Sequence, residues 1–296
     1  MANSKRTVLI TGCSEGGMGA ALAVAFHKAG LHVYATAREL SKMAGLASLG
    51  IETLSLDIQA PASVVTCINQ LSARKSSIDI LVNNAGASAS MPISDLDLEE
   101  AKKLFDLNVW SQLSVTKAFL PMLLQSKGII VNHTSVVSTM AVPFQSPYNA
   151  SKAAMAMFSE SMRLELAPFG ITVVDLKTGA VSTNLVANQK ANTLISLPKD
   201  SLYGVAREAV ESAMRNDKLA NSGMPADQWA TQVVQDLLKT TPPATIWRGT
   251  NAKMGRIGTI FPHGMLDGTM KKLTGLDTVE QMVEKREASY KGTQEQ

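Results

Sequence analysis

Hydrophobic positions before Lys177 come in short runs that alternate with longer segments of mixed polarity. The runs are rich in Val, Ile and Leu at consecutive positions, which is typical of parallel strands that are buried on both faces. This pattern predicts strands at residues 7–11, 31–36, 52–56, 78–82, 128–132 and 171–176, and one more at 245–249.

Between these runs, apolar residues recur with helical spacing. The pattern predicts helices at 20–29, 41–49, 62–73, 98–108, 109–125 and 148–169. Regular alternation of strand and helix favours an α/β protein, namely a Rossmann fold with a doubly wound parallel sheet of about seven strands and helices on both faces. Such folds bind ligands beyond the carboxyl ends of their strands.

After Lys177 the alternation weakens, and helices are predicted at 201–214, 225–238, 264–273 and 278–288. The chain has no internal repeat or long linker, so we expect a single domain over residues 1–296. Its parts are a core at 5–250, a substrate lid at about 183–216 and a C-terminal helical extension at 251–296. Long loops are often functional, and we expect the 183–202 stretch of the lid to be mobile without ligand.

The composition is that of a globular protein, with 45% hydrophobic and 18% charged residues among 296. The net charge of +3 is small and scattered, so it does not indicate a nucleic-acid partner. Cys13 and Cys67 form no disulfide framework and indicate a reducing compartment, and we expect a cytoplasmic protein. No apolar run of about 18 residues and no signal peptide is evident, so no membrane span is expected, while peripheral membrane association stays open.

A glycine-rich turn follows the first predicted strand. Residues 12–19 read Gly-Cys-Ser-Glu-Gly-Gly-Met-Gly, and a helix rich in Ala, Leu and Val comes directly after them. Glycines let the backbone approach a diphosphate closely, and a helix N-terminus offers unpaired N–H groups. Strand, glycine turn and helix in this order predict a dinucleotide site, the alternative being an ordinary turn between a strand and a helix.

Tyr148 and Lys152 lie four residues apart on a predicted helix, with Ser135 upstream of them. This spacing puts the two side chains on one helix face, one turn apart. Free tyrosine has a pKa of about 10, and an adjacent cation favours the phenolate. We expect Lys152 and a positively charged nicotinamide ring to lower the pKa of Tyr148 by ~3 units, which corresponds to about 4 kcal/mol.

These motifs occur together with others in an order that resembles the short-chain dehydrogenase/reductase family. From residue 7 to about 183 the matching residues are Thr11-Gly12-x3-Gly16 with Gly17 and Gly19, Asp57, Asn83-Asn84-Ala85-Gly86, Asn108, Ser135, Tyr148 and Lys152. Within the family, the extra glycine-loop residue and the segments at 33–38 and 246–249 are most similar to hydroxysteroid-dehydrogenase-like enzymes and to fungal acyl-dihydroxyacetone-phosphate reductases.

The resemblance implies four catalytic residues. Tyr148 would protonate a carbonyl oxygen or deprotonate an alcohol, and Lys152 would lower its pKa and hold the nicotinamide ribose. Ser135 would hydrogen-bond the substrate oxygen. Asn108 would tie a water to Lys152 and complete a proton relay. Taken singly, Ser135 is typical of a turn residue and Asn108 of a residue that caps or kinks a helix.

The resemblance also implies a cofactor site. Asn83 is expected to bridge to Thr11 and stiffen the sheet, and Asp57 to face the adenine edge unless it serves as a cap. The Thr183 hydroxyl is expected to reach the nicotinamide carboxamide. The cofactor-binding set is Gly12, Ser14, Gly16, Gly17, Met18, Gly19, Arg38, Asp57, Ile58, Asn84, Ala85, Gly86, Asn108, Tyr148, Lys152, Gly179, Val181 and Thr183. No residue spacing indicates a metal site.

The choice of cofactor depends on the end of the second strand. An acid there binds the ribose hydroxyls of NAD, whereas an arginine accommodates the 2′-phosphate of NADP. Ala37 occupies the position of the acid and Arg38 follows it, which favours NADP(H). Glu39 lies ~20 residues beyond Gly19, where an acid can serve NAD. We interpret Glu39 as the first residue of the next helix, where an acid suits the helix dipole.

Two features depart from the family pattern. The glycine loop has one extra residue, so Gly17 and Gly19 are expected to take the roles of the later glycines. Thr178 stands where a proline is usual, and the turn after it is expected to be slightly looser. Elsewhere, His133 is expected to be packed or hydrogen-bonded rather than catalytic, and Cys13 to be a small filler, with a reactive thiol as the alternative.

These features predict an NADPH-dependent carbonyl (ketone) reductase that acts on a fairly large apolar substrate, such as a lipid, steroid-like or secondary-metabolite ketone. One alternative is an acyl-dihydroxyacetone-phosphate reductase. Another is a non-redox isomerase, cyclase or binding protein on the same scaffold, whose signature would be loss of Tyr148, Lys152 or Ser135. The family commonly pairs subunits through the helices that correspond to 109–125 and 148–169, so a homo-dimer or homo-tetramer is expected.

Overall fold

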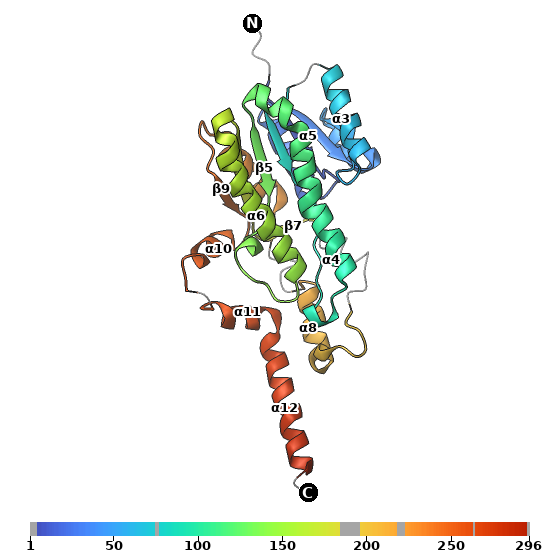
Figure 1. Cartoon of the computed structure of the whole chain (residues 1–296), viewed down its shortest axis with the longest axis vertical. Helices are drawn as coiled ribbons and strands as arrows, with labels where there is room; N and C mark the ends of the chain where they lie inside the picture. Colours follow the sequence, from blue (N-terminus) through green and yellow to red (C-terminus); the bar gives the residue numbers. More distant parts are fainter. Residues whose placement is uncertain (1–4, 75–76, 184–195, 218–222, 263, 295–296) are drawn as a thin grey trace.

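The sheet that the apolar runs predict is present in the computed structural model, which describes residues 5–74, 77–183, 196–217, 223–262 and 264–294. All its pairings are parallel, in the order β3-β2-β1-β4-β5-β6-β9 (Figure 1). The strands are β1 Thr7–Thr11, β2 His32–Ala37, β3 Glu52–Ser55, β4 Ile80–Asn83, β5 Ile129–His133, β6 Thr172–Thr178 and β9 Thr245–Arg248. The strand order reverses between β1 and β4, which is where such sheets bind ligands.

Helices cover both faces of the sheet because successive strand residues point to opposite sides. Val8 and Ile10 of β1 share a core with α1 and α9, whereas Leu9 shares the other core with α3 and α5. The predicted doubly wound Rossmann fold is therefore confirmed. The described α-helices are α1 Met18–Lys28, α2 Ala44–Ser48, α3 Pro61–Ala73, α4 Leu98–Phe105, α5 Ser111–Ser126, α6 Ser146–Leu166, α8 Arg207–Met214, α9 Ala226–Leu237, α10 Ala252–Gly258, α11 Asp267–Thr274 and α12 Leu276–Gln294.

Several elements differ from the predicted ones. The helices predicted at 98–108 and 109–125 are α4 and α5, joined by a π-helical turn at Asp106–Trp110. The helix predicted at 41–49 begins as a 3₁₀ turn, Leu40–Met43, and continues as α2. The short strands β7 Val181–Ser182 and β8 Met224–Pro225 pair with each other and were not predicted, nor was α10.

Helices α11 and α12 lie in the lower part of the molecule in Figure 1, where α12 leads away from the sheet. Val279 of α12 joins Phe144, Val210 and Met214 in a third apolar cluster. Residues 184–195 and 218–222 lie outside the described residues. Most of the 183–202 stretch that is predicted to be mobile, and with it part of the predicted lid, therefore falls outside the described residues. Across the described chain, every helix is too short or too polar to span a membrane.

The packing of α5 against the sheet gives a test of the core. Phe119 is fully buried there. We expect Phe119→Ala to lower the free energy of unfolding by roughly 3–5 kcal/mol, because it removes apolar contacts and leaves a cavity. Urea unfolding measures this. Leu124→Ala, at an exposed position of the same helix, is the matched control and should cost less than about 1 kcal/mol. Equal effects of the two substitutions would contradict the described packing.

Candidate active site

A cleft opens at the point where the strand order reverses. It has a volume of about 330 Å³ and contains residues from the ends of β1, β2, β3 and β4. Many predicted cofactor residues line it, namely Gly12, Ser14, Gly17, Met18, Arg38, Asp57, Ile58, Asn84, Ala85, Gly86 and Thr183. Residues that the prediction omitted also line it: Glu15, Ala37, Leu56, Gln59 and Leu107. These five are sequence neighbours of predicted residues, so the motif positions themselves could have indicated them.

Tyr148 and Lys152 lie on one face of α6, as their spacing predicts. The Lys152 ammonium is 5.8 Å from the centre of the Tyr148 ring and donates a hydrogen bond of 2.8 Å to the backbone oxygen of His133. The Ser135 hydroxyl hydrogen-bonds the Tyr148 side chain. Ser135 is held at the start of a 3₁₀ turn that follows β5, where its oxygen accepts from the Val137 N–H. The end of β5 and helix α6 therefore bring these three side chains together.

Burial governs the protonation of this group. It lowers the pKa of Lys152 from 10.5 to about 8, against the opposing effect of the Asp175 carboxylate. Burial also raises the pKa of Tyr148, and the hydrogen bond from Ser135 only partly opposes this. In the protein alone the pKa of Tyr148 thus lies above its ordinary value, and the expected lowering by Lys152 together with a positively charged nicotinamide ring stays a prediction. The physical reason for the raised pKa is that desolvation of a phenolate outweighs the polar partners that the protein provides.

Asn108 lies in the π-helical turn between α4 and α5 and is fully buried. Its side chain accepts from the Ala87 N–H at 2.9 Å and donates to the Ala87 oxygen at 2.8 Å and to the Ser151 hydroxyl at 3.1 Å. A Cβ placed on Gly86 would lie 2.9 Å from the Asn108 oxygen and 3.7 Å from the Lys152 ammonium. Asn108 and Lys152 therefore both adjoin the wall of the cleft.

The two asparagines at the end of β4 differ from the prediction in which of them contacts Thr11. Asn83 donates to the side-chain oxygens of Thr116 and Asn132, at 2.7 and 2.9 Å. Asn84 is the residue that contacts Thr11: its side-chain amide donates to the Thr11 backbone oxygen at 2.7 Å, and its backbone N–H donates to the Thr11 hydroxyl oxygen at 3.0 Å. The predicted bridge from Asn83 to Thr11 is therefore wrong, because adjacent side chains at a strand end point to opposite sides of the sheet.

The glycine loop suits a diphosphate. Gly12 has a φ of +74°, and a Cβ there would lie 2.8 Å from the Ala85 Cα, so only glycine fits. Gly19 packs against the Gly12 backbone and the Asn84 amide. Gly17 precedes α1 with no side chain capping the helix, which leaves backbone N–H groups facing the loop. The residues present therefore fit a dinucleotide.

The end of β2 presents Arg38 at the cleft wall, exposed to solvent. Glu39 precedes the 3₁₀ turn and pairs with Lys42 at 2.7 Å, which lowers the pKa of the glutamate. This agrees with its interpretation as a residue at the start of the next helix. Asp57 lies in the cleft and also caps the following turn, accepting from the Gln59 N–H at 3.0 Å. The capping role stated as the alternative for Asp57 is thus present, and its place at the adenine edge stays a prediction.

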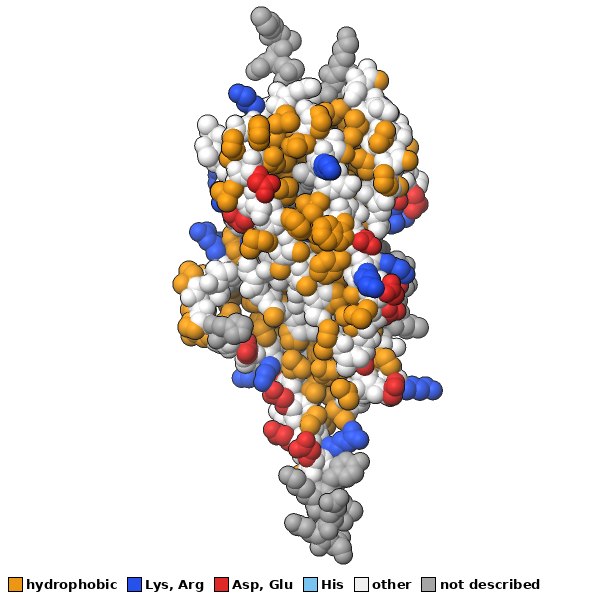
Figure 2. Space-filling view, viewed as in Figure 1, with side chains coloured by type: hydrophobic (Ala, Val, Ile, Leu, Met, Phe, Trp, Pro, Cys, Tyr) orange, Lys and Arg blue, Asp and Glu red, His pale blue; other side chains and the backbone are white. Residues whose placement is uncertain are grey.

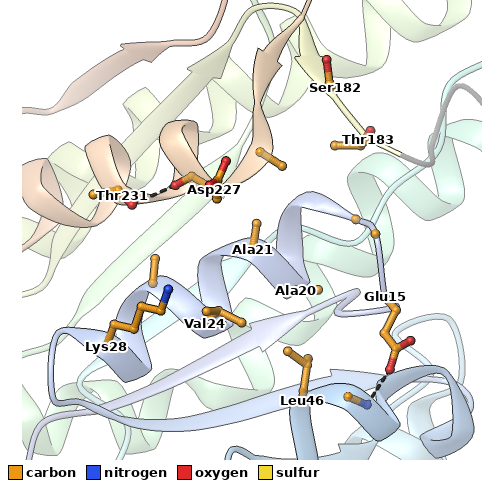
Figure 3. Close-up of a pocket in the computed structure, with 15 residues that line it drawn as sticks. Glu15, Ala20, Ala21, Val24, Lys28, Leu46, Ser182, Thr183, Asp227 and Thr231 are labelled. Atoms are coloured by element: carbon orange, nitrogen blue, oxygen red, sulfur yellow. Dashed lines mark hydrogen bonds between the residues drawn. The ribbon is translucent and has the colours of Figure 1, made fainter. Parts of the chain in front are cut away.

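Some predicted cofactor residues do not line the cleft. Gly16 faces a groove of about 660 Å³ that runs along the outer side of α1 (Figure 3). Figure 3 shows Ala21 and Val24 of α1 on one side of this groove and Asp227 and Thr231 of α9 on the other. Neither Tyr148 nor Lys152 lines this groove. Gly179 and Val181 follow β6, where the Gly179 N–H donates to the Arg248 oxygen at 2.9 Å.

His133 is buried and hydrogen-bonded, as expected. Its ring contacts the side chains of Asn84 and Thr178, and it stacks on Trp229 with 5.3 Å between ring centres. Burial and the nearby Lys152 charge lower the pKa of His133 to about 3. Thr178 therefore contributes a polar side chain at the position where the family pattern has proline.

Comparison with known proteins identifies the class to which this fold and site belong. The family model for short chain dehydrogenase matches residues 6–194. The chain belongs to the short-chain dehydrogenase/reductase family of oxidoreductases. Over 283 residues it is 61% identical to a short-chain dehydrogenase/reductase of Pestalotiopsis microspora, covering 96% of this chain and 99% of that one.

Two further relatives extend the comparison. The NADPH-dependent 1-acyldihydroxyacetone phosphate reductase of Schizosaccharomyces pombe is 37% identical over 270 residues, which is 88% of this chain and 90% of that protein. Among solved structures, a short-chain dehydrogenase from Streptomyces avermitilis superposes with a TM-score of 0.74 at 26% identity, covering 95% of this chain and 99% of that one.

The thiols of Cys13, in the glycine loop, and of Cys67, on α3, provide a test of burial. Burial raises the pKa of Cys13 to about 12 and that of Cys67 to about 11. Since the thiolate is the reactive form, we expect neither to react with a disulfide reagent such as DTNB at pH 8 until the protein unfolds. Absorbance at 412 nm measures the reaction. Rapid labelling of the folded protein that disappears in Cys13→Ser would mean that the glycine-loop thiol is exposed and reactive.

Proposed function

We propose that the protein is an NADPH-dependent carbonyl reductase in which Tyr148 acts as general acid. The observation that carries this proposal is the arrangement of Ser135, Tyr148 and Lys152 beside the dinucleotide cleft. Ser135 follows β5, whereas Tyr148 and Lys152 lie on α6, and Gly86 separates Lys152 from the cleft. The resemblance of the sequence to the family assigns roles to the same residues.

The chemistry requires a proton donor at the substrate oxygen. A bound nicotinamide supplies a hydride to the carbonyl carbon. Tyr148 gives its phenolic proton to the carbonyl oxygen, and burial favours this protonated form of the tyrosine. The Ser135 hydroxyl stabilises the negative charge that develops on the oxygen. Lys152, as a cation beside the cleft, holds the ribose and provides positive charge near Tyr148.

Two features support NADPH rather than NADH. Arg38 is the only Lys or Arg among the residues that line the described cleft, and a guanidinium binds the three oxygens of a phosphate well. Position 37, where an acid would select NAD, is alanine. The relative in S. pombe carries NADPH dependence in its name. Asp57 and the backbone at Ile58 would hold the adenine edge.

The substrate we propose is a fairly large apolar ketone, and a lipid ketone is favoured by the names of two relatives. The reductases of S. pombe and Saccharomyces cerevisiae, 37% and 34% identical, are named for 1-acyldihydroxyacetone phosphate. This makes an acyl-dihydroxyacetone-phosphate reductase the second candidate function. A non-redox isomerase or binding protein ranks below both, because Ser135, Tyr148 and Lys152 are all present.

We also propose that the protein forms a homo-dimer or homo-tetramer through α5 and α6. Figure 2 shows apolar side chains gathered on the face that these helices present. Trp110, Met157 and Leu164 are more than half exposed there. Large exposed apolar side chains in a group are typical of an interface.

Replacing the proposed acid tests the function directly. We expect Tyr148→Phe to lower kcat for ketone reduction by about 10²–10⁴-fold, because it removes the proposed general acid. The dissociation constant for NADPH should change little. Consumption of NADPH at 340 nm against lipid, steroid and polyketide ketones measures the rate. Tyr34→Phe, at a buried position of β2, is the matched control, and undiminished turnover by Tyr148→Phe would exclude the proposed mechanism.

The choice of cofactor depends on one arginine. We expect Arg38→Ala to raise KM for NADPH by about 10–100-fold, because a charge-assisted hydrogen bond to the 2′-phosphate is lost. KM for NADH should stay nearly the same, since NADH has no such phosphate. Arg256→Ala, at an exposed position on α10, provides the control. An unchanged NADPH preference in Arg38→Ala would show that another residue selects the cofactor.

The pKa values predict how the rate depends on pH. Reduction needs Tyr148 protonated and Lys152 charged, and the pKa of Lys152 lies near 8. The rate constant kcat/KM for reduction should therefore be level below pH 8 and fall above it, because this constant reports the free enzyme. Asp175→Asn removes a carboxylate that raises the Lys152 pKa, so the fall should begin at lower pH in this variant. A profile with the same midpoint in both proteins would contradict the assignment to Lys152.

A further inference from the structure

A continuous line of side-chain hydrogen bonds crosses the carboxyl ends of β1, β4, β5 and β6. The Thr178 hydroxyl lies 2.7 Å from Nε2 of His133, and Nδ1 of His133 lies 2.9 Å from Oδ1 of Asn84. The Asn84 amide nitrogen then donates to the backbone oxygens of Thr11 and Gly12, at 2.7 and 3.1 Å. The line thus begins beside the Ser135 turn and ends in the glycine loop.

The chemistry of the groups fixes the direction of every bond in this line. Both amide hydrogens of Asn84 are used by carbonyl oxygens, so its Oδ1 faces His133 and can only accept. His133 must therefore carry its proton on Nδ1, and its Nε2 must accept the proton of the Thr178 hydroxyl. Burial and the charge of Lys152 lower the pKa of His133 to about 3, so the ring is neutral and supplies one donor and one acceptor.

The residues of this line also hold the catalytic groups through their backbones. The ammonium of Lys152 donates to the His133 backbone oxygen at 2.8 Å. The Ser135 hydroxyl donates to the Thr178 backbone oxygen at 3.3 Å. Trp229, fully buried on α9, stacks on the imidazole at an angle of 22° and limits its movement. A shift of His133 or Thr178 would consequently displace Lys152 or Ser135 as well as the glycine loop.

We propose that His133 and Thr178 are positioning residues that keep the glycine loop in register with the Ser135–Tyr148–Lys152 group. A proline at position 178 has no hydroxyl and would leave Nε2 of His133 buried without a partner. The threonine and the histidine therefore belong together as a pair. Thr178 is also 5% exposed and hydrogen-bonded, so the loosening expected from the absence of proline is offset at this position. This inference rests on the proposed function.

Substitutions of the pair test the inference. We expect His133→Leu and Thr178→Val each to raise the dissociation constant for the dinucleotide about tenfold and to lower kcat, because each leaves a buried polar atom unpaired. The double variant should bind scarcely more weakly than the more impaired of the two single variants, since the two residues act as one unit. Thr178→Ser, which keeps the hydroxyl, should retain nearly the wild-type constants. Thr172→Val, at the other end of β6, is the matched control.

Fluorescence titration with NADPH and NADH gives the dissociation constants, and ketone reduction at saturating cofactor gives kcat. A purely structural role would lower the melting temperature of Thr178→Val while leaving both constants unchanged well below that temperature, and this result would overturn the inference. A wild-type protein that binds neither dinucleotide would instead contradict the proposed function, so the two failures are distinguishable.

A spectroscopic measurement on the wild-type protein covers the case in which a variant does not fold. Long-range ¹H–¹⁵N correlation at pH 7 distinguishes the two neutral imidazole tautomers. The spectrum of His133→Leu assigns the His133 signal. If that variant does not fold, substitution of the other histidines assigns it by elimination. We expect the Nδ1–H form for His133. An Nε2–H form would leave no hydrogen between Nδ1 and the Asn84 oxygen, and a charged ring would make Nε2 a donor to Thr178. Either result would overturn the inference.

Discussion

The candidate active site depends on keeping a lysine ammonium charged while it is buried. Lys152 is only 6% exposed, and its one described hydrogen bond goes to the backbone oxygen of His133. Removing an ammonium from water is costly, and its lowered pKa reflects that cost. The Asp175 carboxylate, itself 3% exposed, opposes the shift. The parallel sheet supports the charged form of Lys152 because its carboxyl edge brings the His133 backbone oxygen and the Asp175 carboxylate close to one face of α6.

Burial has the opposite effect on the neighbouring phenol. The desolvation that weakens the Lys152 cation also disfavours a Tyr148 phenolate, so the protein alone holds the tyrosine as an acid. An acid is what carbonyl reduction requires, whereas alcohol oxidation requires a base. The positive charge of an oxidised nicotinamide would favour the phenolate and help the reverse reaction. A raised tyrosine pKa is therefore consistent with the proposed reduction, and the redox state of a bound nicotinamide would adjust it further.

The sequence predicts the sheet and the placing of Tyr148 beside Lys152 for a physical reason: buried parallel strands require consecutive apolar residues, and side chains four apart share a helix face. It does not predict the π-helical turn at Asp106–Trp110, because one inserted residue hardly alters helical periodicity. The misassignment of Asn83 and Asn84 arises because the sequence does not say which side of the sheet a strand-end residue faces. The pairing of His133 with Thr178 depends on the register of β5 against β6, and the direction of the Tyr148 pKa depends on burial; neither is encoded in a local pattern.

The ionisation of Tyr148 is the most direct measure of this account. Ultraviolet difference titration at 295 nm follows phenolate formation, and subtracting the titration of Tyr148→Phe isolates the signal of this residue. The account predicts a pKa above the ordinary value of about 10 in the free protein, and a lower pKa when NADP⁺ is added. A Tyr148 that already ionises well below pH 10 without cofactor, or whose pKa NADP⁺ leaves unchanged, would contradict it.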